Sequence, residues 1–198
     1  MTIILASTSA SRRAMLVAAG VPHRAVPALV DEAPVRDALL AQKVAPRDIA
    51  DALAELKAIK VSQTNPGALV LGGDSVVALA DGMLLDKPVD RADAAAHLRA
   101  MAGTTHQLIS AAVIARDGRP IWRHVDIARL SVRPLLDAFI ESYLDQEWPA
   151  ISGCVGCYRI EGPGIQLFSK IEGSQFTIMG MPLLPILDYL RVQGVLTS

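Results

Sequence analysis

Residues 3–20 read IILASTSASRRAMLVAAG, a short apolar run followed by an apolar pattern of helical type. We expect residues 2–6 to form a buried strand and residues 10–19 to form a helix. Ser9 is a residue type that caps helix N-termini, and Gly20 stands where a glycine commonly follows the end of a helix. The stretch therefore predicts a strand–turn–helix unit at the start of the chain.

The turn of this unit carries hydroxyl groups and adjacent positive charges. Ser7, Thr8 and Ser9 can donate hydrogen bonds. Arg12 and Arg13 have forked guanidinium groups that suit phosphate, and a helix N-terminus adds unpaired N–H groups. The glycines and the Lys-Ser/Thr pair of a Walker A loop are absent. The pattern indicates a phosphate site, and the alternative is a Ser-capped helix with two solvated arginines.

Composition limits the class of protein. With 198 residues, 52% of them hydrophobic, and a formal net charge of −1, the chain can build one folded domain with a substantial core. The absence of a basic block argues against nucleic-acid binding, and no apolar run reaches the ~18 residues of a membrane span. The N-terminus has no signal-peptide pattern, and two cysteines fit a reducing compartment. We expect a single domain over residues 1–198 in the cytoplasm.

The rest of the chain mixes helical and strand patterns. Helices are expected at residues 46–63, 91–102 (with Asp90 as N-cap), 134–145 and 182–192. Strands are expected at residues 21–27, 68–71, 76–85 (a hairpin turning at Asp81-Gly82), 108–115, 121–132, 157–161 and 165–171. Residues 29–45, with prolines around them, are expected to be loop or short turns. Because the two patterns do not alternate strictly, we predict an α/β or α+β fold with a mixed sheet.

Acidic residues near the predicted phosphate site could hold a metal ion. Asp31 and Glu32 fall in the expected loop, whereas Asp74 follows an apolar strand and two glycines. That second position is where α/β proteins place ligand-contacting groups, and paired carboxylates beside phosphate oxygens suit Mg²⁺. Asp74 could also be an ordinary turn residue. Lysines in positions such as those of Lys57 and Lys87 are more often solvated surface residues than ligands.

Three other enzyme chemistries are disfavoured. Cys154 and Cys157 form a C-x-x-C pair, but a redox pair should open a helix, where the helix dipole lowers the pKa of the first thiol. A zinc site would need a second pair of ligands at matching spacing. His106 invites a hydrolase triad, but no G-x-S-x-G motif is present. A thioredoxin-like oxidoreductase remains an alternative that requires a depressed pKa at Cys154.

Short motifs follow one another in a fixed order along the chain. They are ASTSASRR (6–13), VDE (30–32), KA (57–58), GGDS (72–75), KP (87–88), GTTH (103–106), GCYRIEG (156–162), IEGS (171–174) and MGMPL (179–183). Each motif alone is weak. Together, over nearly the whole chain, they resemble the Maf family of nucleoside-triphosphate pyrophosphatases, with Ala10 in place of the family's usual proline.

The resemblance implies both a fold and an activity. The implied fold is akin to that of inosine-triphosphate pyrophosphatases, a mixed sheet with two lobes flanking a deep groove. The implied reaction cleaves a nucleoside triphosphate between its α and β phosphates, giving a monophosphate and pyrophosphate, with a divalent cation, Mg²⁺ or Mn²⁺. Asp74 is implied as the proton acceptor. The positions implied to tune base preference are Ser11, Ser75 and Glu161.

On this basis we expect Asp74 to orient and deprotonate the attacking water and, with Glu32, to hold the metal. An aspartate of ordinary pKa, about 4, is too weak a base for free water, which a bound metal acidifies. Cations and hydroxyls are expected to hold the triphosphate and stabilise the departing pyrophosphate. The residues expected to do so are Ser7, Arg12, Arg13, Lys57 and Lys87.

The residues implied to select the base disagree with one another. At the position of Ser11, relatives that prefer dTTP and UTP carry arginine, and those that prefer 7-methyl-GTP carry tryptophan. Glu161 matches the 7-methyl-GTP group, and a carboxylate favours a base edge that presents donors. We therefore expect a modified nucleotide such as 7-methyl-GTP. The alternatives are a dTTP/UTP-type enzyme and a non-catalytic nucleotide-binding regulator of cell division. A homodimer is common for such folds, although the sequence indicates no interface.

Overall fold

The computed structural model describes residues 2–197, and the chain divides into two compact units. The chain up to Ser75, residues 110–126 and the chain from Gly180 make up unit 1, and residues 76–109 and 127–179 make up unit 2. Three strands contribute residues to both units, namely β3 (Val70–Ala78), β5 (Thr105–Arg116) and β6 (Arg119–Val132). None of the helices within residues 2–197 has the length and apolar character needed to cross a membrane.

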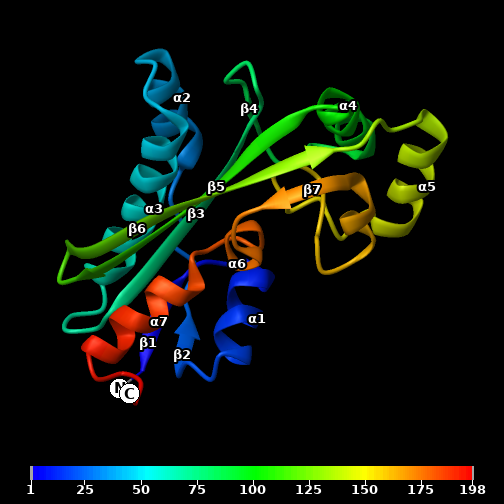
Figure 1. Cartoon of the computed structure of the whole chain (residues 1–198). Helices are drawn as coiled ribbons and strands as arrows, with labels where there is room; N and C mark the ends of the chain where they lie inside the picture. Colours follow the sequence, from blue (N-terminus) through cyan, green and yellow to red (C-terminus); the bar gives the residue numbers. More distant parts are fainter. Residues whose placement is uncertain (1, 198) are drawn as a thin grey trace. The chain divides into compact units, whose positions relative to one another are not determined.

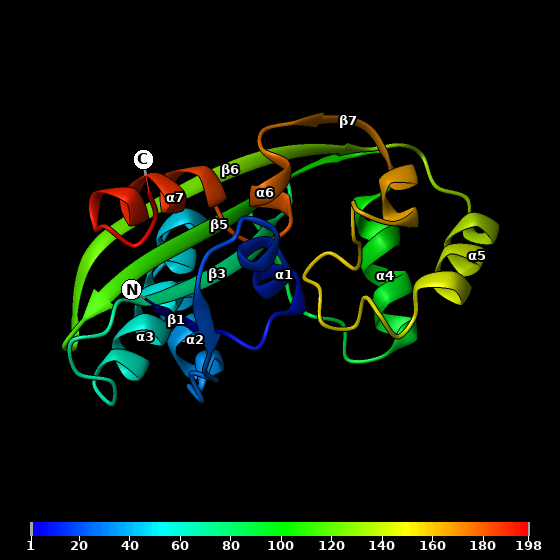
Figure 2. The same cartoon turned by 90° about the horizontal axis from the view of Figure 1, so that it is seen from below.

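The sheet is mixed, which confirms the predicted fold class. Its other strands are β1 (Ile3–Ala6), β2 (His23–Ala25), β4 (Leu84–Leu85) and β7 (Phe168–Glu172). The strand order is β2-β1-β3-β5-β6-β7, and β4 pairs with β3. Strand β1 runs parallel to β2 and β3, whereas the β3–β4 and β6–β7 pairs are antiparallel. Strands β5 and β6 are neighbours joined by a two-residue turn at Asp117-Gly118 (Figure 2).

The helices are α1 (Ala10–Ala18), α2 (Glu32–Ala41), α3 (Pro46–Ser62), α4 (Arg91–Met101), α5 (Asp137–Glu147), α6 (Gln175–Ile178) and α7 (Leu183–Val192). Figure 1 locates each of them along the chain. The predicted strand–turn–helix unit is β1 followed by α1. Ser9 caps α1 by accepting a hydrogen bond from the backbone N–H of Arg12 at 3.4 Å, and Gly20 has the positive φ (67°) of a residue that follows a helix end.

Two adjacent glycines of β3 show how unit 1 is layered. A Cβ atom at Gly72 would lie 2.3 Å from the carbonyl oxygen of Ala54, so α3 approaches the backbone of the strand directly. A Cβ atom at Gly73 would lie 3.4 Å from Nε of Arg12, on α1. Because successive residues of a strand face opposite sides of a sheet, α3 and α1 cover opposite faces of β3. Two predicted site residues, the substrate-binding candidate Lys57 and the catalytic candidate Asp74, come from this α3–β3 pair of elements.

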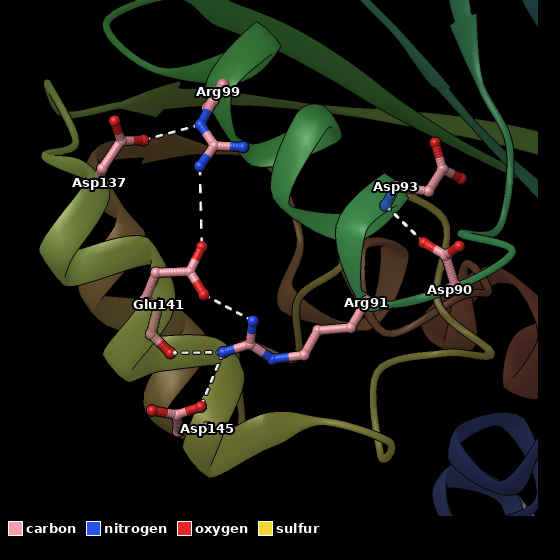
Figure 3. A network of polar contacts seen from close by, with 7 residues as sticks. All are labelled: Asp90, Arg91, Asp93, Arg99, Asp137, Glu141 and Asp145. Carbon is pink, nitrogen blue, oxygen red and sulfur yellow. Dashed lines mark hydrogen bonds and ion pairs between the residues drawn. The ribbon is translucent and has the colours of Figure 1, made fainter.

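Unit 2 has its own apolar core and a polar seam between two of its helices. The core includes Leu98, Leu130 and Leu144, each at most 1% exposed. At the seam, Arg91 and Arg99 on α4 form ion pairs with three acidic side chains of α5 (Figure 3). Asp90 caps α4 as predicted, by accepting a hydrogen bond from the N–H of Asp93 at 2.8 Å. These ion pairs link the exposed sides of α4 and α5, whose apolar sides share one core.

The structure corrects several predicted elements. Residues 29–45 were expected to be loop, but they contain α2, whose Pro34 lies in the first helical turn, where a missing N–H costs no hydrogen bond. The expected strand at 157–161 is wrong, because Gly156 and Cys157 have φ values of +82° and +60° and the segment forms turns. The expected strand at 165–171 begins instead with the 3₁₀ helix η1 (Pro163–Leu167) and continues as β7.

Other corrections concern boundaries. The strand expected at 68–71 continues as β3 through both glycines to Ala78, so Asp74 lies inside a strand and does not occupy a turn. The hairpin expected at 76–85 exists, with Val77 opposite Leu85. The short helix α6 had no counterpart among the predicted elements.

Candidate active site

Three predicted site residues meet in unit 1. The Nζ atom of Lys57 lies 2.6 Å from Oδ1 of Asp74 and 2.8 Å from Oε2 of Glu32. Asp74 comes from the middle of β3, Lys57 from the buried face of α3, and Glu32 from the first turn of α2. Three elements distant in sequence therefore bring two carboxylates to one ammonium group.

This cluster is largely shielded from water on its Lys57–Asp74 side. The side chains of Lys57 and Asp74 are 11% and 10% exposed, whereas that of Glu32 is 42% exposed. Burial raises the pKa of Asp74, and the charges of Lys57 and Arg12 oppose that rise. The result is a carboxyl group with a raised pKa, which makes it a better proton acceptor than an ordinary aspartate.

Arg12 is held within the fold close to the carboxylates. Its Nε donates a hydrogen bond to the carbonyl oxygen of Gly180 at 2.7 Å, and its Nη2 donates to Oγ of Ser75 at 2.9 Å. Burial lowers the pKa of Arg12, and the charges of Asp74 and Glu32 act in the opposite direction. The guanidinium group of Arg12 therefore interacts electrostatically with both carboxylates. Arg12 is not a solvated surface residue, which was the alternative.

The serines of the opening motif organise the start of α1. Oγ of Ser7 accepts a hydrogen bond from the backbone N–H of Ser9 at 3.1 Å, and the hydroxyls of Ser9 and Ser11 lie 2.9 Å apart. Arg13, by contrast, is exposed at the surface of the helix. The turn formed by Ser7, Thr8 and Ser9 belongs to the same unit as Glu32, Lys57 and Asp74. Arg12 is linked to both, because its backbone N–H donates to Ser9 and its charge acts on Asp74.

Two further predicted residues, Lys87 and Glu161, belong to unit 2. Both are exposed, and their charges act in opposite directions on the pKa of the Cys154 thiol, Glu161 raising it and Lys87 lowering it. Their roles as a phosphate ligand and a base-selecting residue stay predictions.

The donor set of the cluster fits a divalent metal that is shared with a substrate. Glu32 and Asp74 both direct carboxylate oxygens at one cationic group, which is the kind of ligand that Mg²⁺ and Mn²⁺ take. Within residues 2–197 no group of three or more His, Cys, Asp or Glu side chains could hold a metal by itself. Two carboxylates are sufficient where phosphate oxygens supply the remaining ligands.

The cysteines and His106 lack the properties of reactive groups. Burial raises the pKa of Cys157 to about 12, and the pKa of Cys154 is also raised, the opposite of what a redox C-x-x-C requires. His106 is buried, its Nε2 lies 2.9 Å from the hydroxyl oxygen of Tyr158, and burial lowers its pKa to about 4. The raised pKa values of the two thiols argue against the oxidoreductase alternative. His106 is a buried structural residue.

Sequence reasoning missed two contributors to the Arg12 environment. Gly180 was noted only as part of a motif, although its carbonyl group accepts the shortest hydrogen bond of Arg12. Ser110 was missed because it lies in the otherwise apolar run 108–115 of β5. Its hydroxyl oxygen lies 2.8 Å from that of Ser75. A single buried hydroxyl in an apolar strand is the signal that could have identified it.

Comparison with known proteins places the chain in a family. The sequence model of the Maf-like protein family matches residues 2–193, and the chain belongs to the Maf family. It is 53% identical over 195 residues to a nucleoside triphosphate pyrophosphatase of Sphingopyxis alaskensis, covering 98% of both chains. It is 52% identical over 195 residues to one of Caulobacter vibrioides, covering 98% of this chain and 97% of the other. It is also 50% identical over 194 residues to a 7-methyl-GTP pyrophosphatase of Mesorhizobium japonicum, covering 98% of this chain and 97% of the other.

Proposed function

We propose that this protein is a nucleoside-triphosphate pyrophosphatase that hydrolyses the bond between the α and β phosphates, releasing a nucleoside monophosphate and pyrophosphate. The observation that carries the proposal is the buried Lys57–Asp74 pair with Glu32 beside it, in a chain of the Maf family. A protein that only binds nucleotides needs cations but gains nothing from a buried carboxylate with a raised pKa. The three relatives compared above are named pyrophosphatases, which supports the same function for this chain.

Asp74 is the group proposed to take the proton of the attacking water. Its burial raises its pKa, which increases its basicity, while Lys57 at 2.6 Å keeps enough of it ionised to act. The β3 backbone on both sides of Asp74 is fixed by the sheet, so the carboxylate is held in place before substrate arrives.

Cations are proposed to bind the triphosphate and stabilise the leaving pyrophosphate. Arg12 is fixed by hydrogen bonds to Gly180 and Ser75, so its position costs no ordering when the substrate binds. Arg13 and Lys87 are exposed and available to phosphate, and Ser7 adds a hydroxyl at the start of α1. Phosphoryl transfer depends mainly on such positioning and charge compensation.

Glu32 and Asp74 would hold a divalent cation, Mg²⁺ or Mn²⁺, together with phosphate oxygens of the substrate. When bound, such a cation lowers the pKa of water and neutralises charge on the triphosphate. In the structure the ammonium of Lys57 contacts both carboxylates. Lys57 therefore has two tasks, namely compensating the carboxylate charge and contributing a cation to the phosphate site.

For the natural nucleotide we propose a modified purine triphosphate such as 7-methyl-GTP. Glu161 supports this choice of nucleotide, since a carboxylate accepts hydrogen bonds from the donor groups of a guanine edge. One relative, at 50% identity, carries the name 7-methyl-GTP pyrophosphatase. Ser11 offers no aromatic surface, so stacking on a methylated base would be absent at this position. A homodimer and a cytoplasmic location stay predictions.

The test is pyrophosphate release from a panel of ordinary and modified nucleoside triphosphates, with Mg²⁺ or Mn²⁺. Wild-type protein is compared with Asp74→Asn, which keeps the size of the side chain and removes the base. Asp37→Asn, at an exposed carboxylate of α2, is the matched control. We expect turnover of a narrow set of nucleotides, lost in Asp74→Asn and retained in Asp37→Asn. Nucleotide binding without turnover on any member of the panel would favour the non-catalytic regulator, and preference for dTTP and UTP would overturn the substrate proposal.

A further inference from the structure

We propose that Ser110 is a positioning residue for Arg12 and acts through the hydroxyl group of Ser75. Position 75 would then contribute to triphosphate binding by fixing Arg12, without contacting the base itself. The inference deepens the proposed function, since it concerns how the same site holds its phosphate-binding arginine.

The two hydrogen bonds of the Arg12 side chain fix the orientation of its guanidinium group. Nε and Nη2 lie on one edge of this planar group, and they donate to Gly180 O at 2.7 Å and Ser75 Oγ at 2.9 Å. Because the fork is rigid, holding one edge also fixes the direction of the remaining N–H groups. Any change that moves Oγ of Ser75 therefore reorients the whole guanidinium group.

We infer that Ser110 donates to the hydroxyl of Ser75, which leaves that hydroxyl no hydrogen-bonding capacity for a ligand. A serine hydroxyl has one hydrogen and two lone pairs. Oγ of Ser75 accepts from Arg12 at 2.9 Å, lies 2.8 Å from Oγ of Ser110, and can donate to Gly180 O at 3.3 Å. With Ser110 as the donor in their contact, all three positions are used. Ser110 then determines where the Ser75 hydroxyl points, and Ser75 orients Arg12.

Burial limits the access of water to the hydroxyl group of Ser110. Ser110 is fully buried and Arg12 is 9% exposed. Glycines enclose the arginine on two sides, since a Cβ atom at either Gly73 or Gly180 would lie 3.4 Å from its Nε. Gly180 has a φ of +115°, a conformation that side-chain-bearing residues rarely adopt. Small residues thus form a tight socket around Arg12, in which Ser110 is fully buried and Ser75 is partly exposed.

The socket lies next to the catalytic candidate. Ser75 follows Asp74 along β3, and the charge of Arg12 opposes the pKa rise of Asp74. A displaced Arg12 would therefore alter both phosphate binding and the environment of the proposed base. Losing one net hydrogen bond corresponds to about a 2- to 12-fold change in an equilibrium constant, which sets the expected size of the effect.

The test measures Ser110→Ala and Ser110→Thr, the second of which keeps the hydroxyl. Ser62→Ala is the control, because Ser62 is another fully buried serine of unit 1 whose hydroxyl bonds to Ile59 and Gly118. We expect Ser110→Ala to raise KM about 2- to 12-fold for every nucleotide that is turned over, with a smaller change in kcat. Ser110→Thr should restore KM. Ser62→Ala should lower Tm without changing KM.

Two further measurements separate this inference from the proposed function. In a Ser75→Ala background the effect of Ser110→Ala should disappear, and an effect of unchanged size there would overturn the inference. The affinity of each variant for inorganic pyrophosphate and for an α,β-methylene nucleoside triphosphate is measured by calorimetry. If wild-type protein hydrolyses no nucleotide, the proposed enzyme activity fails, yet weaker pyrophosphate binding by Ser110→Ala still supports the role in positioning Arg12. Unchanged affinity and kinetics in Ser110→Ala would refute it.

Discussion

The ammonium group of Lys57 lies 2.6 Å from the carboxylate of Asp74, and both side chains are about nine-tenths buried. A buried carboxylate tends to take up a proton unless a partner charge compensates for its lost hydration. Lys57 is this partner, and it binds Glu32 as well. The ionisation of the proposed base therefore depends on a residue of another element, and this dependence can be measured.

Replacing Lys57 with methionine should raise the pKa of Asp74 further, since Lys57 is the largest influence that lowers it. A base acts in its deprotonated form, so the rise of kcat/KM with increasing pH should move to higher pH. At neutral pH we expect a loss of about 10- to 100-fold, reflecting both the protonated base and the missing cation. The measurement is a pH profile of pyrophosphate release. Lys57→Arg keeps the charge and should leave the acid side of the profile nearly in place, and a profile of unaltered shape in Lys57→Met would contradict the assignment.

Gly72→Ala should reduce stability and activity together. The added Cβ would lie 2.3 Å from the carbonyl oxygen of Ala54 and 2.7 Å from the N atom of Ala58, both in the backbone of α3. Relieving this overlap must move α3 away from β3, at a cost of about 1–3 kcal/mol or more. Lys57 would be carried away from Asp74 by the same movement. Gly153→Ala, where no atom lies within 4 Å of the new Cβ, is the control for denaturant unfolding and activity, and it should be nearly neutral.

His106 should make stability depend on pH below neutrality. Its pKa is lowered to about 4 in the folded protein, against an ordinary value of about 6.5 in the unfolded chain. Between these values the unfolded state binds more protons, so the free energy of unfolding should fall as pH decreases from 6.5 to 4. The total is on the order of 3 kcal/mol. Urea unfolding at a series of pH values should show a shallower dependence in His106→Gln, and an equally steep dependence would exclude His106 as the cause.

The seam between α4 and α5 should contribute a salt-sensitive part of the stability of unit 2. Arg91 contacts Glu141 at 2.5 Å and Asp145 at 2.7 Å, and Arg99 contacts Asp137 at 2.7 Å. These side chains are substantially exposed, so salt screens their attraction. Glu141→Gln should lower Tm slightly, and the difference from wild type should shrink in 1 M NaCl, a concentration at which the screening length is about 3 Å. A difference that persists at high salt would indicate that packing, and not charge, holds the seam.

Local signals explain which parts of the fold could be predicted. The β1–α1 unit was predicted correctly because an apolar run, a capping serine and a closing glycine all lie within 18 residues of sequence, from 3 to 20. Helix α2 was not predicted because none of its residues is buried, so its sequence lacks the 3.6-residue spacing of apolar residues that indicates a helix. Pro34 also suggested a loop. The strand expected at 157–161 is wrong because Cys157 has a φ of +60°, a conformation that a cysteine rarely adopts and that its residue type does not predict.

The candidate site was predictable as a set of residues but not as an arrangement. The sequence indicates Glu32, Lys57 and Asp74 as site residues, and the structure brings them together. Their pairing could not be predicted, because a lysine on the polar side of a helix is more often solvated, and its expected partner here was phosphate. The link from Ser110 to Arg12 depends on a contact between strands and a carbonyl group from a distant loop, and no local pattern encodes it.

The hydrogen bond between Arg12 and Gly180 joins residues 168 positions apart. During synthesis Arg12 is made early, whereas Gly180 is made 168 residues later. A growing chain that has not yet reached Gly180 has the serines and the carboxylates of the site, but it lacks the carbonyl group that holds its arginine. The phosphate-binding arginine is thus fixed only after the segment that follows α6 has been made.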